Sequence, residues 1–133
     1  MVIREDHHYY TAFTSRWGLY KYNVQPFGLV NAPSGFQHLM NSVLGEGLDT
    51  MCTVYLDDIL VYSHNDEEHR RHLAWVFGKL REHGLHVKRS KCKFGVSQIE
   101  YLGHLVTAEG VKPDPGKVSV IKSWPVPTNV RKV

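Results

Sequence analysis

Apolar side chains recur along the chain with two spacings, which predict two kinds of element. Within residues 31–47 and 66–84 they follow the i, i+3, i+4, i+7 spacing of one helix face. Asn31 and Asp66 open these segments as the expected N-caps, and glycines close them. A shorter third helix is expected after Asp114, with two apolar residues facing inward, Val118 and Ile121.

The segments between these helices have the pattern of β-hairpins. Residues 11–24, 51–63 and 99–111 are rich in β-branched and aromatic residues and contain turn-forming positions, with a bend at Gly103 in the last of them. The first ten residues show neither period and predict an arm. Hairpins alternating with helices predict an α+β fold, in which helices pack on one face of an antiparallel sheet.

Composition and charge limit the class of protein. The 133 residues are 42% hydrophobic and 22% charged, which is typical of a soluble globular domain. The net charge of +3 permits an anionic partner without requiring one. Cys52 and Cys92 stand far apart in unlike contexts, which predicts reduced thiols in an intracellular protein. No apolar run is long enough to span a membrane, and the charged start is unlike a secretory signal.

Two adjacent aspartates, Asp57 and Asp58, interrupt the strand-like run VYLDDILVYS. A polar turn accounts for them on the simplest interpretation, because aspartate is common in turns. The apolar, β-branched flanks favour a second interpretation, in which a rigid hairpin presents both carboxylates to hard divalent cations. Two such ions about 4 Å apart can stabilise the attacking and leaving oxygens of a phosphoryl transfer.

Several motifs resemble one family when they are taken together and in order. YLDD at residues 55–58 resembles the catalytic motif of reverse transcriptases, and QPFGLVNAPSGFQ at 25–37 resembles their nucleotide- and template-contacting motif. EEHRRHL, SKCKFG and EYLGHLVTAEGVKPDPGKV follow in the family order. From about Ile3 onward the chain resembles the polymerase palm of gypsy-type LTR retrotransposons, which implies an RNA-directed DNA polymerase acting on a template–primer and deoxynucleotides.

The resemblance also implies a role for each matching residue. Asp57 and Asp58 match the two metal-binding aspartates, so Mg²⁺, or Mn²⁺ in its place, is the implied cofactor. Lys91 or Lys93 matches the lysine proposed to protonate the leaving pyrophosphate. The nucleotide- and template-binding positions are matched by Gln25, Pro26, Phe27, Gly28, Tyr55 and Leu56. The primer grip is matched by Tyr101, Leu102 and Gly103.

Polymerases of the resembled family use a third catalytic aspartate, on a strand before the first hairpin. We expect this chain to begin after that strand, so that the 133 residues alone do not extend a primer. Residues 1–124 are expected to form a partial palm with a fingers hairpin at 11–24, and residues 125–133 a tail that begins the linker to a thumb. The sheet edge left open beside the catalytic hairpin is expected to favour self-association.

A second function of a different class fits the same residues. A catalytically inactive palm could bind nucleic acid or a protein partner instead of extending a primer. Four cations lie within residues 88–93, where a solvated loop and a set of phosphate contacts are equally good interpretations. Primer extension distinguishes the two functions, because only the polymerase requires both carboxylates.

Overall fold

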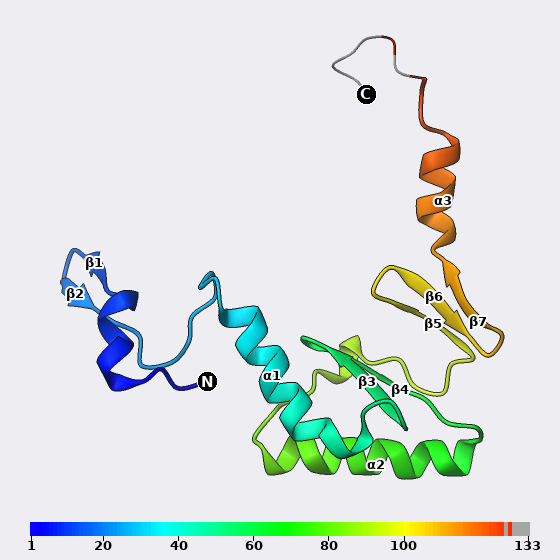
Figure 1. Cartoon of the computed structure of the whole chain (residues 1–133), viewed down its shortest axis with the longest axis horizontal. Coiled ribbons are helices and arrows are strands. Elements are labelled where there is room, and N and C mark those ends of the chain that lie inside the picture. The colour runs from blue at the N-terminus through cyan, green and yellow to red at the C-terminus, as the bar shows by residue number, and fades with distance from the viewer. Residues whose placement is uncertain (127, 129–133) are drawn as a thin grey trace. The chain divides into compact units, whose positions relative to one another are not determined.

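A computed structural model describes residues 1–126 and residue 128. The chain forms two compact units, of which the first is Met1–His86 and the second begins at Val87. Each unit has its own helices and strands (Figure 1). No helix in this described part of the chain is long and apolar enough to cross a membrane.

The first unit contains two hairpins, two long helices and two short 3₁₀ turns. The segment predicted as an arm instead contains a 3₁₀ helix, η1, and the first hairpin is shorter than residues 11–24. Backbone bonds tie the start of the chain to the segment after this hairpin, with Ile3 N–H donating to Asn23 O over 3.0 Å. The elements are η1 (Glu5–Thr11), β1 (Phe13–Ser15), β2 (Gly18–Tyr20), α1 (Ala32–Leu44), η2 (Gly45–Gly47), β3 (Cys52–Tyr55), β4 (Asp58–Val61) and α2 (Asp66–Glu82).

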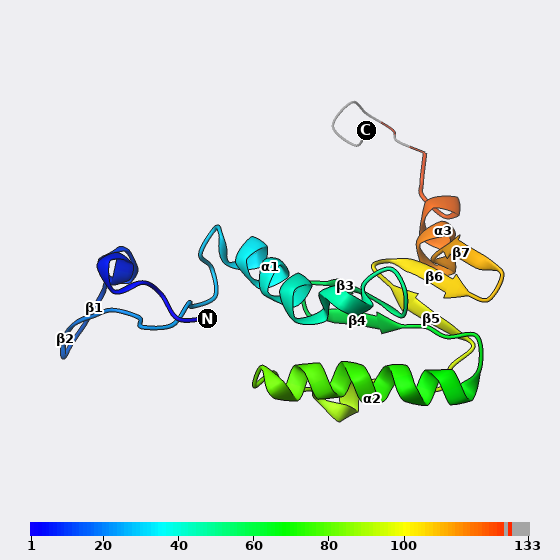
Figure 2. The same cartoon turned by 60° about the horizontal axis from the view of Figure 1, so that its bottom comes forward.

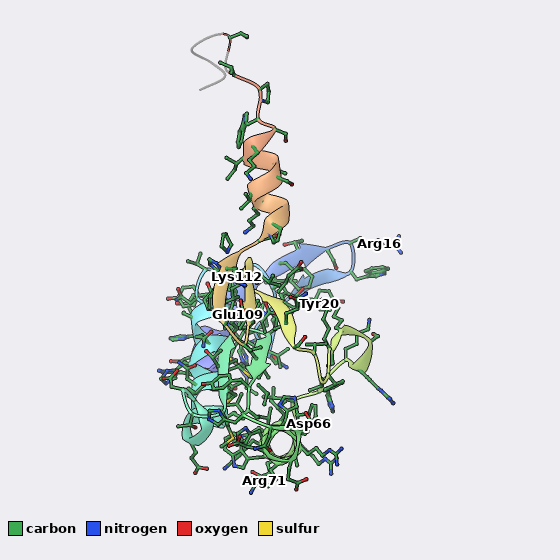
Figure 3. All side chains as sticks on the ribbon, turned by 90° about the vertical axis from the view of Figure 1, so that its right-hand side faces the viewer. Arg16, Tyr20, Asp66, Arg71, Glu109 and Lys112 are labelled. Carbon is green, nitrogen blue, oxygen red and sulfur yellow. The ribbon has the colours of Figure 1, made fainter. Side chains whose placement is uncertain are left out.

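Aromatic contacts and exposed side chains characterise the β1–β2 hairpin. Phe13 stacks on Tyr20 with ring centroids 5.9 Å apart, and the Arg16 guanidinium lies 3.9 Å from the Trp17 ring centroid. Figure 3 shows Arg16 and Tyr20 on this hairpin. Trp17 is 73% exposed and Leu19 is 72% exposed, so this hairpin contributes little to the core.

The core of the first unit forms where α1 and α2 pack on the β3–β4 hairpin. Both helices contact each other, α1 contacts β3, and α2 contacts β4 (Figures 1 and 2). Helix α1 buries the apolar stripe that its spacing predicted, and this confirms the expected helix. The buried hydrophobic residues are Met40, Val43, Leu44, Cys52, Val54, Val76 and Leu80.

Helix α2 begins with two capping hydrogen bonds. The Asn65 side chain accepts a 2.9 Å hydrogen bond from Glu68 N–H, while the Glu68 carboxylate accepts a 2.8 Å bond from His64 N–H. The predicted cap, Asp66, is wrong by one residue: Asp66 is already the first helical residue. At α1 the predicted cap Asn31 precedes the helix, but its side chain makes no capping bond.

The Glu68 carboxyl should make the stability of the first unit depend on pH. The bond from His64 N–H, and then the charges of His64, His72 and Arg71, lower the pKa of Glu68. A lowered folded-state pKa gives stability that is present above the ordinary value of about 4.3 and is lost as pH falls through the folded value. We therefore expect the melting temperature of wild type to exceed that of Glu68→Gln at pH 7, and the difference to vanish in acid. A difference that is constant with pH would contradict this.

The second unit is a three-stranded antiparallel sheet followed by a helix. Strand β7, which the sequence pattern did not predict, pairs with β6 through the register Val106↔Val111. In Figure 3 Glu109 and Lys112 lie at this edge, where their ion pair spans 2.7 Å. The elements are η3 (Arg89–Lys91), β5 (Gln98–Tyr101), β6 (His104–Thr107), β7 (Gly110–Pro113) and α3 (Pro115–Lys122).

Helix α3 agrees only in part with its prediction. The Asp114 side chain caps it by accepting a 2.7 Å bond from Gly116 N–H, as expected. Val118 is half-buried, but the inward orientation predicted for Ile121 is wrong, since Ile121 is 66% exposed. The buried hydrophobic residues of the described chain all belong to the first unit.

Candidate active site

The two aspartates lie at the tip of the β3–β4 hairpin. Tyr55 pairs with Asp58, so Leu56 and Asp57 form a two-residue turn. Asp57 and Asp58 are both exposed, which confirms the expected placement on a hairpin tip. Leu56 has φ +52°, a left-handed conformation that costs a residue with a Cβ about 1–2 kcal/mol. Positive φ at the first central residue is what tight two-residue hairpin turns require.

Gln37 on α1 bonds to the backbone on both sides of Tyr55, the last residue of β3. Its Oε1 accepts a 2.6 Å hydrogen bond from Leu56 N–H, and its Nε2 donates to Val54 O over 3.1 Å. Sequence reasoning assigned no role to Gln37, although the residue ends the quoted motif at 25–37. In the sequence, the one indication of a bonded pair is that Asn41 follows Gln37 by four residues on the predicted helix. In the structure, Asn41 Oδ1 accepts a 2.7 Å hydrogen bond from Gln37 Nε2.

The donor set at the turn suits a hard divalent cation. Two adjacent carboxylates supply oxygen ligands, and Mg²⁺ is commonly held by one or two carboxylates while it keeps several waters. Within residues 1–126 and 128, no group of three or more His, Cys, Asp and Glu side chains is arranged to hold a metal ion. Asp57 and Asp58 thus fit part of a metal site, to which the described residues bring no third carboxylate.

A second polar site lies at the junction of β4 and α2. A hollow of about 220 Å³ is lined by Thr50, Tyr62, Ser63, His64, Glu68 and His72. His72 Nδ1 lies 2.7 Å from Ser63 Oγ and 3.0 Å from Tyr62 O, an atom that can only accept. His72 Nδ1 must therefore carry a proton and cannot serve as a base toward Ser63. Ser63 Oγ also lies 3.2 Å from His69 Nδ1, so the hydroxyl bonds between two imidazoles and joins the end of β4 to α2.

The loop predicted to contact nucleotide and template precedes α1 in the first unit. Gln25 and Pro26 are half-buried, and Gln25 N–H donates to Met1 O over 2.9 Å. The Phe27 side chain is fully exposed, and Gly28 has φ +95°. An exposed aromatic face beside a residue without a Cβ suits contact with a base, and the roles of these residues stay predictions.

The predicted primer grip is a second tight turn, in the other unit. Tyr101 pairs with His104, and the two central residues have positive φ, +50° at Leu102 and +75° at Gly103. Positive φ at both positions defines a type I′ hairpin turn. The ammonium group of Lys117, from α3, lies where a Cβ on Gly103 would project. The turn thus carries an exposed cation on its surface.

Gly103→Ala is expected to destabilise this turn by about 1 kcal/mol, because alanine resists positive φ. The new methyl group would also displace the Lys117 ammonium, which can move because it ends a flexible side chain. Thermal unfolding followed through the amide signals of β5 and β6 measures the loss. The same substitution in a Lys117→Ala background should cost nearly as much. A loss that disappears in that background would mean that the lysine, and not the backbone, causes it.

The two candidate lysines lie at the start of the second unit. Lys91 ends η3 and its N–H donates to Lys88 O over 2.9 Å, while Lys93 follows two residues later. Both side chains are exposed. Their approach to a leaving pyrophosphate, and hence their catalytic role, stays a prediction.

Comparison with known proteins identifies relatives for most of the chain. Residues 3–106 match the family described as reverse transcriptase (RNA-dependent DNA polymerase). The chain is 43% identical over 123 residues to the retrovirus-related Pol polyprotein from transposon 297 of Drosophila melanogaster, and 39% identical to that from transposon gypsy. These alignments cover 92% of this chain but only 12% of each polyprotein.

Solved structures share the fold as well. The foamy viral protease–reverse transcriptase in complex with dsDNA superimposes with a TM-score of 0.83 at 25% identity, over 98% of this chain and 27% of that one. The same viral protein in complex with an RNA/DNA hybrid gives a TM-score of 0.81, over 98% of this chain and 18% of that one. These matches confirm the predicted α+β fold. With the sequence relatives, they show that the chain belongs to the reverse transcriptase (RNA-dependent DNA polymerase) family.

Proposed function

We propose that this chain is part of an RNA-directed DNA polymerase, in which the β3–β4 hairpin supplies two of the catalytic carboxylates. The observation that carries the proposal is the exposed pair Asp57 and Asp58 on a turn that Gln37 bonds where it leaves β3. Family membership and the Pol polyprotein relatives favour this function over an inactive palm. The reverse transcriptase family implies use of a divalent metal, and we assign Mg²⁺ to these two residues, with Mn²⁺ as its substitute.

The reaction would be nucleotidyl transfer to a primer. The 3′-hydroxyl of the primer would give up its proton to water, its oxygen would form a bond to the α-phosphorus of a deoxynucleotide, and the bond from that phosphorus to pyrophosphate would break. Bound Mg²⁺ would offset the negative charge that develops on the phosphoryl oxygens. Asp57 and Asp58 would supply ligands to the metal, and Lys91 or Lys93 would donate a proton to the leaving pyrophosphate.

Substrate contacts follow the same assignment. Phe27 and Gly28 would face the nucleotide and the templating base, preceded by Gln25 and Pro26, while Tyr55 and Leu56 flank the primer terminus. Tyr101, Leu102 and Gly103 would hold the primer strand. Complexes of the viral relatives with dsDNA and with an RNA/DNA hybrid support a nucleic-acid partner.

The organisation that we propose treats residues 1–124 as a partial palm carrying the fingers hairpin at 11–24. Residues 125–133 are then a tail that leads toward a thumb, and residues 127 and 129–133 of it lie outside the described residues. We place the protein inside the cell, in the cytoplasm or nucleus. Burial, and secondarily the charge of Asp49, raises the pKa of the Cys52 thiol, which suits a reduced and unreactive cysteine.

Titration with Mn²⁺ tests the metal assignment on the 133-residue chain itself. Paramagnetic broadening of amide NMR signals should begin at Asp57 and Asp58 and be lost in Asp57→Asn. Asp6→Asn is the matched control, because Asp6 is also exposed but pairs only with neighbouring side chains of the N-terminal segment, Arg4 and His7. Broadening that begins instead at the histidines of α2 would refute the assignment.

We also propose that two copies of the chain associate through the outer edge of β4. Val54 O accepts a bond from Gln37 and therefore points away from β4. Ile59 lies opposite Val54, so the backbone N–H and C=O groups of Ile59, and of Val61 two residues later, point away from β3. In the described chain β4 pairs only with β3, and an unpaired strand edge recruits another strand.

Self-association should therefore appear in sedimentation at micromolar concentration and in hydrogen exchange. The amides of Ile59 and Val61 should exchange more slowly as the protein concentration rises, because a second copy covers them. Leu60 is the internal control, since its amide faces β3 and should be protected at every concentration. A monomer with concentration-independent exchange at Ile59 would contradict the proposal.

A further inference from the structure

The Gln37 side chain contacts the backbone where the turn that carries the two aspartates begins. It bonds to Leu56 N–H at 2.6 Å and to Val54 O at 3.1 Å, so its amide spans the residue that leads into the turn. The side chain comes from α1, which packs against β3 and carries part of the buried core. The turn is thus tied to the rigid part of the unit by a side chain and not only by its own strands.

Only one orientation of the Gln37 amide satisfies all its partners. Leu56 N–H can only donate and Val54 O can only accept, so the oxygen must face the first and the nitrogen the second. Asn41 Oδ1 takes a further bond from the same nitrogen, over 2.7 Å, and holds this orientation. Glutamate lacks the donor, asparagine is one carbon shorter, and methionine has neither group. Glutamine is therefore specifically suited to this position.

The conformation that Gln37 holds is one that leucine resists. Leu56 has φ +52°, and such conformations persist in proteins where the surroundings enforce them. The Leu56 backbone sets the direction in which the turn leaves β3, and Asp57 follows at the next residue. Without the bond to Leu56 N–H, the turn could relax and the two carboxylates would lose their fixed spacing.

We infer that Gln37 is a positioning residue that holds the left-handed turn at Leu56 and so fixes Asp57 and Asp58 for metal binding. This inference rests on the proposed function and deepens it. Gln37 touches neither carboxylate in the contacts described, and it acts through the backbone at Val54 and Leu56. A residue in this outer position typically changes metal affinity by 10–100-fold when it is replaced.

The experiment compares Gln37→Met, Gln37→Glu and Asn41→Ala in the 133-residue chain. Methionine keeps the length and apolar contacts but removes every hydrogen bond, glutamate keeps the acceptor for Leu56 N–H, and Asn41→Ala removes only the outer partner. Two quantities are measured: the hydrogen-exchange rate of the Leu56 amide without metal, and the Mn²⁺ concentration that half-broadens the Asp57 and Asp58 signals.

In Gln37→Met we expect the Leu56 amide to exchange at least about 10-fold faster and the half-broadening concentration of Mn²⁺ to rise about 10-fold. Gln37→Glu should restore slow exchange at Leu56, and Asn41→Ala should leave both quantities within about 2-fold of wild type. Unchanged exchange, or faster exchange with unchanged Mn²⁺ binding, would overturn the role of Gln37. Failure of wild type to bind Mn²⁺ at Asp57 and Asp58 would instead refute the proposed function.

Discussion

Asp57→Asn is expected to reduce primer extension by about three orders of magnitude or more in a polymerase built around this chain. The assay uses the Pol polyprotein of transposon 297 with its matching 123-residue segment replaced by this chain. Asparagine keeps the size of the side chain but removes the negative charge, so the loss measures metal binding and not packing. The exposed position of Asp57 supports this separation, because the substitution disturbs no buried contact.

Two controls make this result interpretable. Asp6→Asn removes a carboxylate of similar exposure from η1 and should leave extension unchanged, and Asp58→Asn should match the loss in Asp57→Asn. The 133-residue chain by itself should show no extension, because its turn offers two carboxylates and the described residues bring no third ligand to them. Template-dependent extension that survives Asp57→Asn would refute the assignment of this hairpin as catalytic.

Leu44→Ala is expected to cause the largest loss of stability, about 2–5 kcal/mol. Leu44 has no exposed surface and belongs to the seven buried hydrophobic residues of the first unit. A domain of this size rarely has more than about 5–15 kcal/mol of stability, so the variant should be largely unfolded at moderate temperature. Urea denaturation followed by circular dichroism measures the change.

Leu19→Ala is the matched control, because the same atoms are removed from a side chain that is 72% exposed. Its free energy of unfolding should lie within about 0.5 kcal/mol of wild type. Equal losses in the two variants would mean that the core does not lie where α1, α2 and the β3–β4 hairpin meet.

The amphipathic helices and the catalytic hairpin could be predicted because each has a local signal. Helix α1 has a 3.6-residue apolar period from Phe36 to Leu44. The residues on either side of Asp57 and Asp58 are β-branched and apolar, and they favour strands independently of the rest of the chain. The cap of α2 was misassigned by one residue because Asn65 and Asp66 are both good caps in sequence. Only the bond from Glu68 N–H decides between them.

The features that could not be predicted depend on contacts between distant residues. Strand β7 ends in Pro113 and is exposed throughout, so it exists through pairing with β6 and not through its own pattern. Helix η1 is joined to the segment after β2 by Tyr22 N–H, which donates to Thr11 Oγ1 over 2.9 Å. Gln37 and Asn41 look like an ordinary solvated pair on a helix, and their role becomes visible only when the hairpin 17 residues later is placed beside them.

The distribution of buried side chains predicts that the second unit depends on a ligand for part of its stability. The buried hydrophobic residues of the described chain lie before His86, whereas the predicted primer grip lies after it. A sheet with so little buried apolar surface has a small intrinsic stability. If it grips a primer, binding must also supply part of its folding free energy, and the measured affinity will be lower than the contacts alone would give. The stability of the second unit then depends on how well the bound duplex fits it. A duplex of the right shape would raise the free energy of unfolding, and a distorted duplex would not.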